Sequence, residues 1–177
     1  MIQRIIDAVE SNFGENDGNQ KQVNPDGMLT VAPIWGLPIA TRQFQCDVFM
    51  LMPFREEFRA VYAEHIQPIA RSFGLDMKLG DDFFSKHDIV REIWSAIHSS
   101  KFVIADCTGK NANVFYELGM AHILGKPAIM ITQNEEDIPF DVQAKRYIQY
   151  ENTSEGLHQL EEAMKTAIMK LMSELDE

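Results

Sequence analysis

Short apolar runs alternate with helical patterns about five times after residue 46, and this alternation constrains the fold more than any other feature. The first run, CDVFMLMPF, is almost continuously apolar, which is typical of a strand buried on both faces. Alternating strands and helices predict an α/β protein whose parallel sheet carries helices on both faces. The five predicted strands lie at 46–54, 75–79, 101–106, 128–132 and 146–150.

Helical patterns fill the segments between these strands and also close the chain. Gly74 ends the first of them and Pro68 lies late in it, where a kink is expected. For five strands the expected order is 2-1-3-4-5, a flavodoxin-like (Rossmann-like) three-layer sandwich. Strands 1 and 3 are then neighbours, and the loops that follow them, 52–57 and 106–113, diverge at the carboxyl edge of the sheet. Ligands of such sheets bind in that crevice.

The first 45 residues read differently from the rest. Residues 1–13 predict a short amphipathic helix, 14–27 a polar linker, and 28–44 an extended arm or short strands. We therefore expect an N-terminal helix and arm at 1–45 and an α/β domain at 46–177. The apolar face of the N-terminal helix and a Met-rich C-terminal helix both favour packing against a second copy, so a homo-oligomer is expected.

Charge and composition narrow the range of partners. The formal net charge is -11, with 27 acidic and 16 basic residues, which argues against binding a nucleic acid polymer. A small anionic ligand remains compatible, because a few backbone N–H groups can hold one phosphate. No run approaches the ~20 apolar residues of a membrane span, and the start is unlike a signal peptide. Two cysteines and five scattered histidines predict neither disulfides nor a metal, so we expect a cytoplasmic protein without a cofactor.

Glu117 is a carboxylate among apolar residues of the predicted helix in NANVFYELGMAHILGKP (111–127). If Asn111 or Asn113 caps this helix, Glu117 lies in or just beyond its first turn, where the helix dipole favours an ionised carboxylate. Asn113 lies four residues earlier and shares its face. Such a carboxylate can attack an anomeric carbon or stabilise an oxocarbenium ion. Alternatively, the helix dipole alone explains an acidic residue at this position.

The two crevice loops supply further candidates. Arg55 and Lys110 face each other across the predicted crevice and could meet a phosphate, or they are plain surface charges. Asp106 ends the third strand, where it either contacts a ligand or holds its own loop through backbone N–H groups.

The segment FVIADCTGKNANVFYELGMAHILGKPAIMITQ (102–133) resembles the nucleoside 2-deoxyribosyltransferase-like superfamily. Most similar are its short bacterial members with an MPF loop, an NxNVFYELG helix and an IPFD segment. Here these motifs are Met52-Pro53-Phe54, Asn111 to Gly119, and Ile138-Pro139-Phe140-Asp141, and the resemblance spans about 46–150. The superfamily is structurally similar to TIR domains, in which a helix glutamate cleaves the nicotinamide–ribose bond of NAD.

The resemblance implies roles for several residues. Glu117 matches the nucleophile that takes the deoxyribosyl group from the base, and Asn111 matches a residue that contacts the sugar or its phosphate. Asp88 and Glu92, on the preceding helix, are both candidates for assisting the leaving base. The transferases open with a glycine-containing loop, whereas Met52 precedes Pro53 here, so its larger side chain narrows the room for a ribose or phosphate.

Two functions are therefore expected. The first is an enzyme that cleaves or transfers the N-glycosidic bond of a nucleoside, nucleotide or NAD-type substrate, with Glu117 as nucleophile. Its sugar and phosphate would be positioned by Asn111 and Asn113 and by the loop residues Pro53, Phe54 and Arg55. The second is a non-catalytic nucleotide-binding or TIR-like self-associating module. Both act on a small molecule at the same crevice.

Overall fold

The computed structural model of the chain describes residues 34–39, 45–82, 89–143 and 147–175. The chain divides into two compact units, Met1–Gly36 and Leu37–Glu177, and the α/β fold belongs to the second. The predicted helix 1–13 and linker 14–27 lie outside the described residues, so the predicted domain boundary stays a prediction. Within the second unit, the Ile39 N–H donates to the Ser95 hydroxyl at 2.7 Å.

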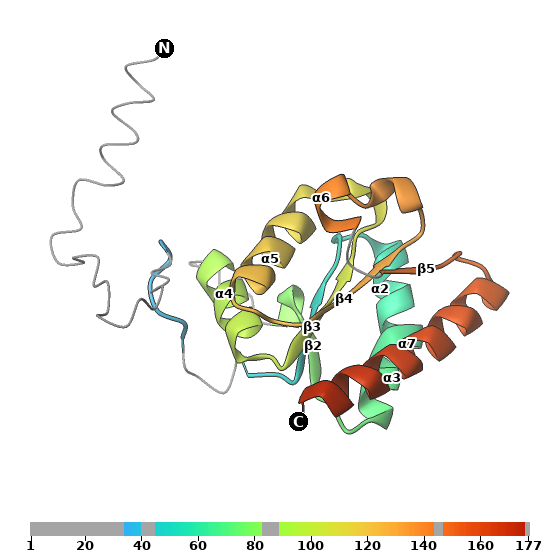
Figure 1. Cartoon of the computed structure of the whole chain (residues 1–177), viewed down its shortest axis with the longest axis horizontal. Helices are drawn as coiled ribbons and strands as arrows, with labels where there is room; N and C mark the ends of the chain where they lie inside the picture. Colours follow the sequence, from blue (N-terminus) through green and yellow to red (C-terminus); the bar gives the residue numbers. More distant parts are fainter. Residues whose placement is uncertain (1–33, 40–44, 83–88, 144–146, 176–177) are drawn as a thin grey trace, which may run out of the picture. The chain divides into compact units, whose positions relative to one another are not determined.

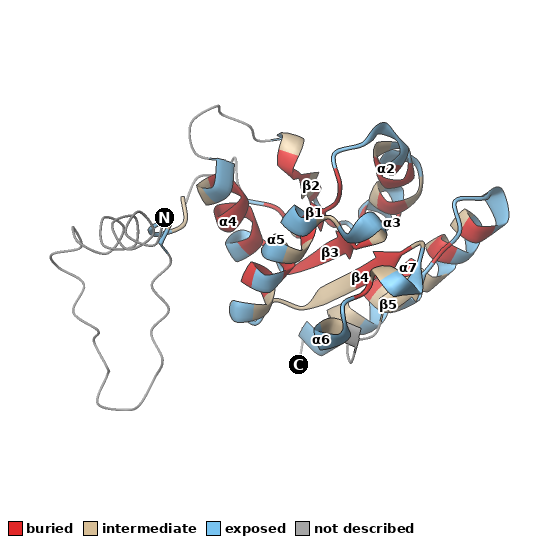
Figure 2. Cartoon of the chain, turned by 90° about the horizontal axis from the view of Figure 1, so that it is seen from above, coloured by how far each residue is buried: buried red, intermediate tan, exposed pale blue. Residues whose placement is uncertain are grey.

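The described residues form one five-stranded parallel sheet with the predicted order β2-β1-β3-β4-β5 (Figure 1). The central strand β3 is buried along its whole length (Figure 2), which explains its unbroken apolar run. β1 lies between β2 and β3, and its last residue, Leu51, pairs with Ala105 near the end of β3. The strands are β1 Val48–Leu51, β2 Met77–Leu79, β3 Phe102–Asp106, β4 Ala128–Thr132 and β5 Tyr147–Gln149.

Helices cover both faces of the sheet, which completes the predicted three-layer sandwich (Figure 1). One layer holds α4 Ile89–Ser99, α5 Ala112–Ile123 and the short α6 Phe140–Gln143. The other holds α7 Ser154–Leu175 and the helical segment that follows β1, which consists of α2 Glu56–Val61, the π-helical turn η2 Tyr62–Ile66 and α3 Gln67–Ser72. None of the described helices combines the length and the apolar character that a membrane crossing requires.

Pro68 explains the π-helical turn in the first helical segment. Proline has no N–H to donate to the carbonyl of residue 64, and its ring crowds that carbonyl. The chain accommodates it by widening the preceding turn, so that the Gln67 N–H reaches back to the Tyr62 carbonyl five residues earlier. The predicted irregularity is therefore present, as a widened turn within one helical segment.

The largest cluster of buried side chains lies between the sheet and the α2–α3–α7 layer. Burial of these apolar side chains is the main contribution that holds the layers together. Because this side of the sheet is tightly filled, ligand access is left to the carboxyl edge and to the α4–α5 side. The members of the cluster from these helices include Phe58, Val61, Ile66, Ile69, Leu160, Met164 and Ile168.

Candidate active site

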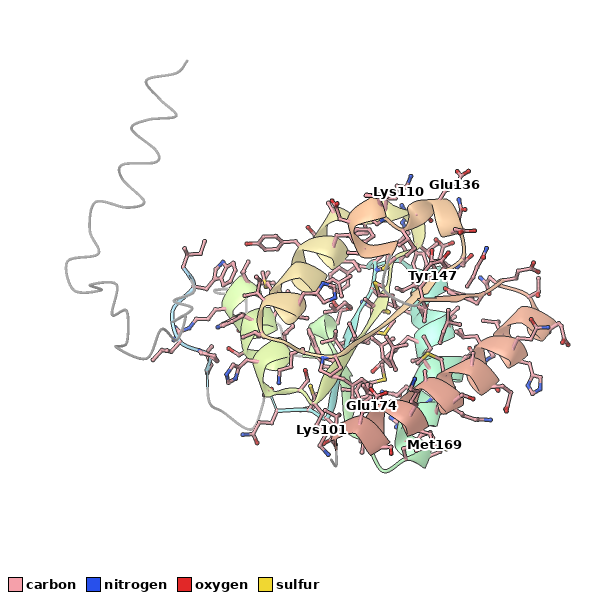
Figure 3. All side chains as sticks on the ribbon, viewed as in Figure 1. Lys101, Lys110, Glu136, Tyr147, Met169 and Glu174 are labelled. Carbon is pink, nitrogen blue, oxygen red and sulfur yellow. The ribbon has the colours of Figure 1, made fainter. Side chains whose placement is uncertain are left out.

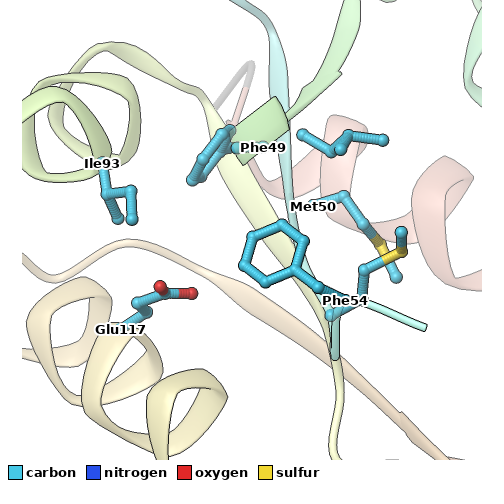
Figure 4. A pocket seen from close by; sticks show the side chains of 8 residues that line it. Phe49, Met50, Phe54, Ile93 and Glu117 are labelled. Atoms are coloured by element: carbon cyan, nitrogen blue, oxygen red, sulfur yellow. The ribbon is translucent and has the colours of Figure 1, made fainter. Parts of the chain in front are cut away.

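A small hollow lies where β1 and β2 end, beneath α4 and α5 (Figure 4). Glu117 reaches it from α5 and is its one charged lining residue among those described. In Figure 4 the carboxylate of Glu117 points toward the ring of Phe54. The other lining residues are Phe49, Met50, Met52, Phe54, Leu79, Gly80 and Ile93.

The hollow is narrow. It leaves about 10 Å³ for the centre of a water-sized sphere, within about 250 Å³ of space that no atom fills. This is roughly the room that one water molecule needs, and a ribose is several times larger. Met52 is buried, whereas Phe54 is 51% exposed and borders the hollow on the solvent side. A sugar therefore reaches Glu117 only if the side chains of the 52–54 loop move.

Glu117 is the sixth residue of α5, one turn beyond the N–H groups that the helix leaves unpaired. Burial among apolar neighbours raises the pKa of its carboxyl to about 7, and no charged group among the described residues offsets this shift. The expectation of a fully ionised carboxylate is therefore wrong, because removal from water outweighs the helix dipole at this distance. Near neutral pH both protonation states of Glu117 are populated.

Asn111 caps α5, as one of the two alternatives predicted. Its side-chain oxygen accepts hydrogen bonds from the N–H groups of Asn113 at 3.0 Å and Val114 at 3.3 Å. This bonding occupies the carbonyl end of the Asn111 side chain, which is therefore committed to starting the helix that carries Glu117. Asn113 is exposed, and neither asparagine lines the hollow. Their roles in substrate binding stay predictions.

Asp106 is buried, with a relative exposure of 1%, and holds its own loop. One carboxylate oxygen accepts from the Thr108 N–H at 3.0 Å, and the other accepts from the Tyr150 hydroxyl at 2.8 Å. Burial raises the pKa of Asp106, although these hydrogen bonds oppose the shift. Of the two alternatives for Asp106, the structure supports the loop-holding role, and the expectation that it contacts substrate is wrong because both oxygens are engaged out of solvent.

The Asp106–Tyr150 pair is part of a larger network that fixes the loop before α5. The Tyr150 hydroxyl also accepts from the Gln133 side-chain amide at 3.1 Å, and the Gln133 N–H donates to the Thr108 hydroxyl at 3.0 Å. The Gly109 N–H donates to the Asp137 carboxylate at 2.7 Å. Bonds from β4, β5 and the intervening turn thus position the segment from which α5 starts.

Replacing Tyr150 with phenylalanine tests this network. The change leaves a buried oxygen of Asp106 without its donor, so the free energy of unfolding should fall by about 1–3 kcal/mol. Tyr147→Phe is the matched control, because Tyr147 lies on the same edge strand with its hydroxyl bonded to Glu135 at the surface. Its cost should stay within about 0.5 kcal/mol. Urea denaturation measures both, and equal losses would contradict a stabilising role for the buried pair.

The remaining predicted residues occupy varied positions. Pro53 is buried beside the hollow, whereas Arg55 is exposed and lies 3.6 Å from Glu57. This placement supports the surface-charge alternative for Arg55. Glu92 is 3% exposed and precedes the lining residue Ile93 on α4. Asp88 lies outside the described residues, so the choice of assisting acid stays open.

The hollow differs from the predicted crevice in its second wall. We expected the loops after β1 and β3 to line it together, but apart from Glu117 its second wall is the end of β2, at Leu79 and Gly80, with Ile93 of α4. Sequence reasoning missed Phe49, Leu79, Gly80 and Ile93 as lining residues. Their one available signal was the strand order, because it places the end of β2 beside the loop after β1.

Fold and site together define an α/β protein of the flavodoxin-like class with one carboxylate in an apolar hollow at the carboxyl edge of its sheet. Solved structures of the same fold include the TIR domain of a Toll-related receptor from Hydra magnipapillata, with a TM-score of 0.54 and 14% identity over 75% of this chain and 100% of that one. A 2-deoxyribosyltransferase from Bacillus psychrosaccharolyticus, described as a biocatalyst for the synthesis of nucleosides, has a TM-score of 0.51 and 16% identity over 64% of this chain and 89% of that one.

A CMP N-glycosidase from Clostridium botulinum also matches, over 65% of this chain and 98% of that one, with 18% identity and a TM-score of 0.49. No protein-family model and no curated protein matches the sequence. The likeness to a TIR domain and to a deoxyribosyltransferase confirms, at the level of the fold, the resemblance that the sequence motifs indicate.

Proposed function

We propose that this protein cleaves the N-glycosidic bond of a nucleoside, a nucleotide or an NAD-type molecule, with Glu117 as the nucleophile. The observation that carries the proposal is the placement of a single carboxylate in an apolar hollow at the carboxyl edge of a parallel sheet, where such folds bind ligands. Supporting it are the NxNVFYELG motif around Glu117 and the shared fold with a 2-deoxyribosyltransferase.

The chemistry follows from the two protonation states of Glu117. In its ionised form, a carboxylate oxygen bonds to the anomeric carbon while the bond from that carbon to the base nitrogen breaks, and the base leaves with the electron pair. Glu92 or Asp88 would protonate the leaving base. Water, or a second base in a transfer reaction, then displaces the sugar from Glu117 and restores the carboxylate. The apolar surroundings strengthen the attraction between this carboxylate and the cationic sugar of the transition state.

The non-catalytic alternative is favoured by one observation, which is the narrowness of the hollow. A binding or signalling module needs no room for a ribose at Glu117, whereas an enzyme requires the loop 52–54 to open. Under this alternative, a nucleotide would bind at the loops or promote self-association, and the carboxylate would be inert. Measured turnover distinguishes the two functions.

The first experiment is a base-release assay with the wild-type chain. Deoxynucleosides, ribonucleosides, nucleoside monophosphates and NAD are incubated separately with the protein, and free base or nicotinamide is followed by chromatography. We expect release from at least one of these classes. A folded protein that releases base from none of them, although thermal shift shows that it binds one, would establish the non-catalytic alternative in its place.

Phe54→Ala should raise kcat/KM for the substrate found in that assay. Displacing a half-exposed phenylalanine costs about 1 kcal/mol of apolar burial, so removing the side chain should increase kcat/KM by roughly fivefold. Phe140→Ala is the matched control, because Phe140 is 86% exposed and does not line the hollow. Steady-state kinetics on both variants make the comparison. A decrease for Phe54→Ala would mean that its ring contacts the substrate and is not an obstacle to it.

A further inference from the structure

The outer face of α5 carries exposed apolar residues that the proposed reaction does not use. Tyr116 is 54% exposed and Ile123 is 70% exposed, and Ala112 and Gly119 are exposed as well. The spacings of four, three and four residues place these four side-chain positions on one stripe along the helix. We call Ala112, Tyr116, Gly119 and Ile123 the α5 stripe. Glu117 is about 100° around the helix from Tyr116, so the stripe and the hollow occupy different sides.

Gly119, near the centre of the stripe, is not required by the fold of the single chain. A Cβ placed on it would meet no atom within 4 Å, and its φ lies outside the left-handed region that favours glycine. Glycine inside a helix is destabilising relative to other residues. What it provides here is bare backbone at the surface, which allows a second helix to approach closely.

The charge pattern indicates what kind of partner fits this face. The chain carries a formal net charge of -11, so two copies repel each other wherever acidic surfaces meet. The exposed residues of α5, which are the α5 stripe and Asn113, include no charged side chain. The exposed face of α7, by contrast, carries Glu155, Glu162, Lys170 and Glu174. An uncharged apolar face on an acidic protein is complementary to a copy of itself.

We propose that two copies of this chain associate through their α5 stripes, with the helices antiparallel about a two-fold axis beside Gly119. Such an interface is self-complementary, since each contact occurs twice. Tyr116 lies three residues before Gly119 and Ile123 lies four after it, so Tyr116 of one copy meets Ile123 of the other. Gly119 of both copies lies at the crossing point. α5 is flanked by α4 and the short α6 in its layer, which leaves it accessible to a second copy (Figure 1).

A charge-pattern experiment tests this arrangement on the full chain. In Tyr116→Lys/Ile123→Lys the antiparallel pairing brings lysine against lysine twice, whereas in Tyr116→Lys/Ile123→Glu it brings lysine against glutamate twice. We expect the wild type to sediment as a dimer. The double-lysine variant should weaken the dimer at least about 30-fold, and the lysine–glutamate variant should dimerise more tightly than the double-lysine variant. Analytical ultracentrifugation across a dilution series measures all three dissociation constants.

Met169→Lys is the control for introducing a lysine at an exposed apolar site. Met169 is 61% exposed on α7, in the other helical layer (Figure 3), and this variant should dimerise like the wild type. Gly119→Gln provides a second test, because the single chain has space for the side chain while the helix crossing does not. It should weaken the dimer at least about tenfold without lowering the melting temperature of the dilute protein. A wild type that stays monomeric at about 100 μM, or equal dissociation constants for the two charge variants, would overturn the proposal.

Discussion

Glu117→Gln is expected to lower the rate of base release by roughly 10⁴-fold, the order of loss seen when one member of a nucleophilic catalytic group is removed. Glutamine keeps the shape of the side chain but cannot form the bond to the anomeric carbon, and its neutral amide does not stabilise a cationic sugar. Because the uncharged side chain suits the apolar hollow, the variant should fold and bind ligand. The loss should therefore appear in kcat, with KM changed little.

Single-turnover and steady-state kinetics on the substrate identified with the wild type measure this effect. Glu136→Gln is the matched control, because Glu136 is an exposed glutamate in the turn between β4 and α6. It should retain full activity. If Glu117→Gln released base at more than about a tenth of the wild-type rate, Glu117 would not be the nucleophile, since general acid–base assistance alone contributes more than that.

The same substitution should stabilise the fold at high pH. Burial raises the pKa of Glu117 from 4.5 to about 7 in the folded chain. Between these values the folded state holds the proton and the unfolded state does not, so the wild-type free energy of unfolding falls as the pH rises. Below 4.5 the carboxyl is neutral in both states and the penalty vanishes. Glu117→Gln should therefore match the wild type near pH 4 and exceed it by about 2–3 kcal/mol at pH 8.

Urea denaturation of both proteins between pH 4 and pH 8 gives the difference at each pH directly. Glu136→Gln again serves as the control, and its difference from the wild type should stay flat because an exposed carboxylate is solvated in both states. A difference for Glu117→Gln that stays equally flat would mean that water or a cation reaches the carboxylate in solution. That outcome would remove the basis for a neutral-range pKa.

The fold was predictable because the strands of this sheet are buried on both faces, which leaves continuous apolar runs such as 101–106. The strand order followed from the number of strands and the rule for parallel connections. The ends of the strands were less predictable. The first strand was expected at 46–54 but spans Val48–Leu51, because β2 offers it only three residues to pair with. No local sequence signal records the length of a neighbouring strand.

The site was predictable only in its centre. The motif around Glu117 placed a carboxylate near the carboxyl edge of the sheet, but an Asp or Asn can hold a loop or contact a ligand with the same side chain. Asp106 and Asn111 proved to be engaged with backbone N–H groups. The protonation of Glu117 was beyond sequence reasoning, because it depends on neighbours from β1, β2 and α4 that are distant along the chain.

The buried bond between Asp106 and Tyr150 joins the middle of the sheet to its rim. Tyr150 directly follows the edge strand β5, and Asp106 ends the central strand that leads to α5. Local opening at the rim breaks this bond and releases the segment that starts the helix of Glu117. The edge strand and the catalytic helix therefore open as one cooperative unit, and amide hydrogens in both should exchange with similar protection.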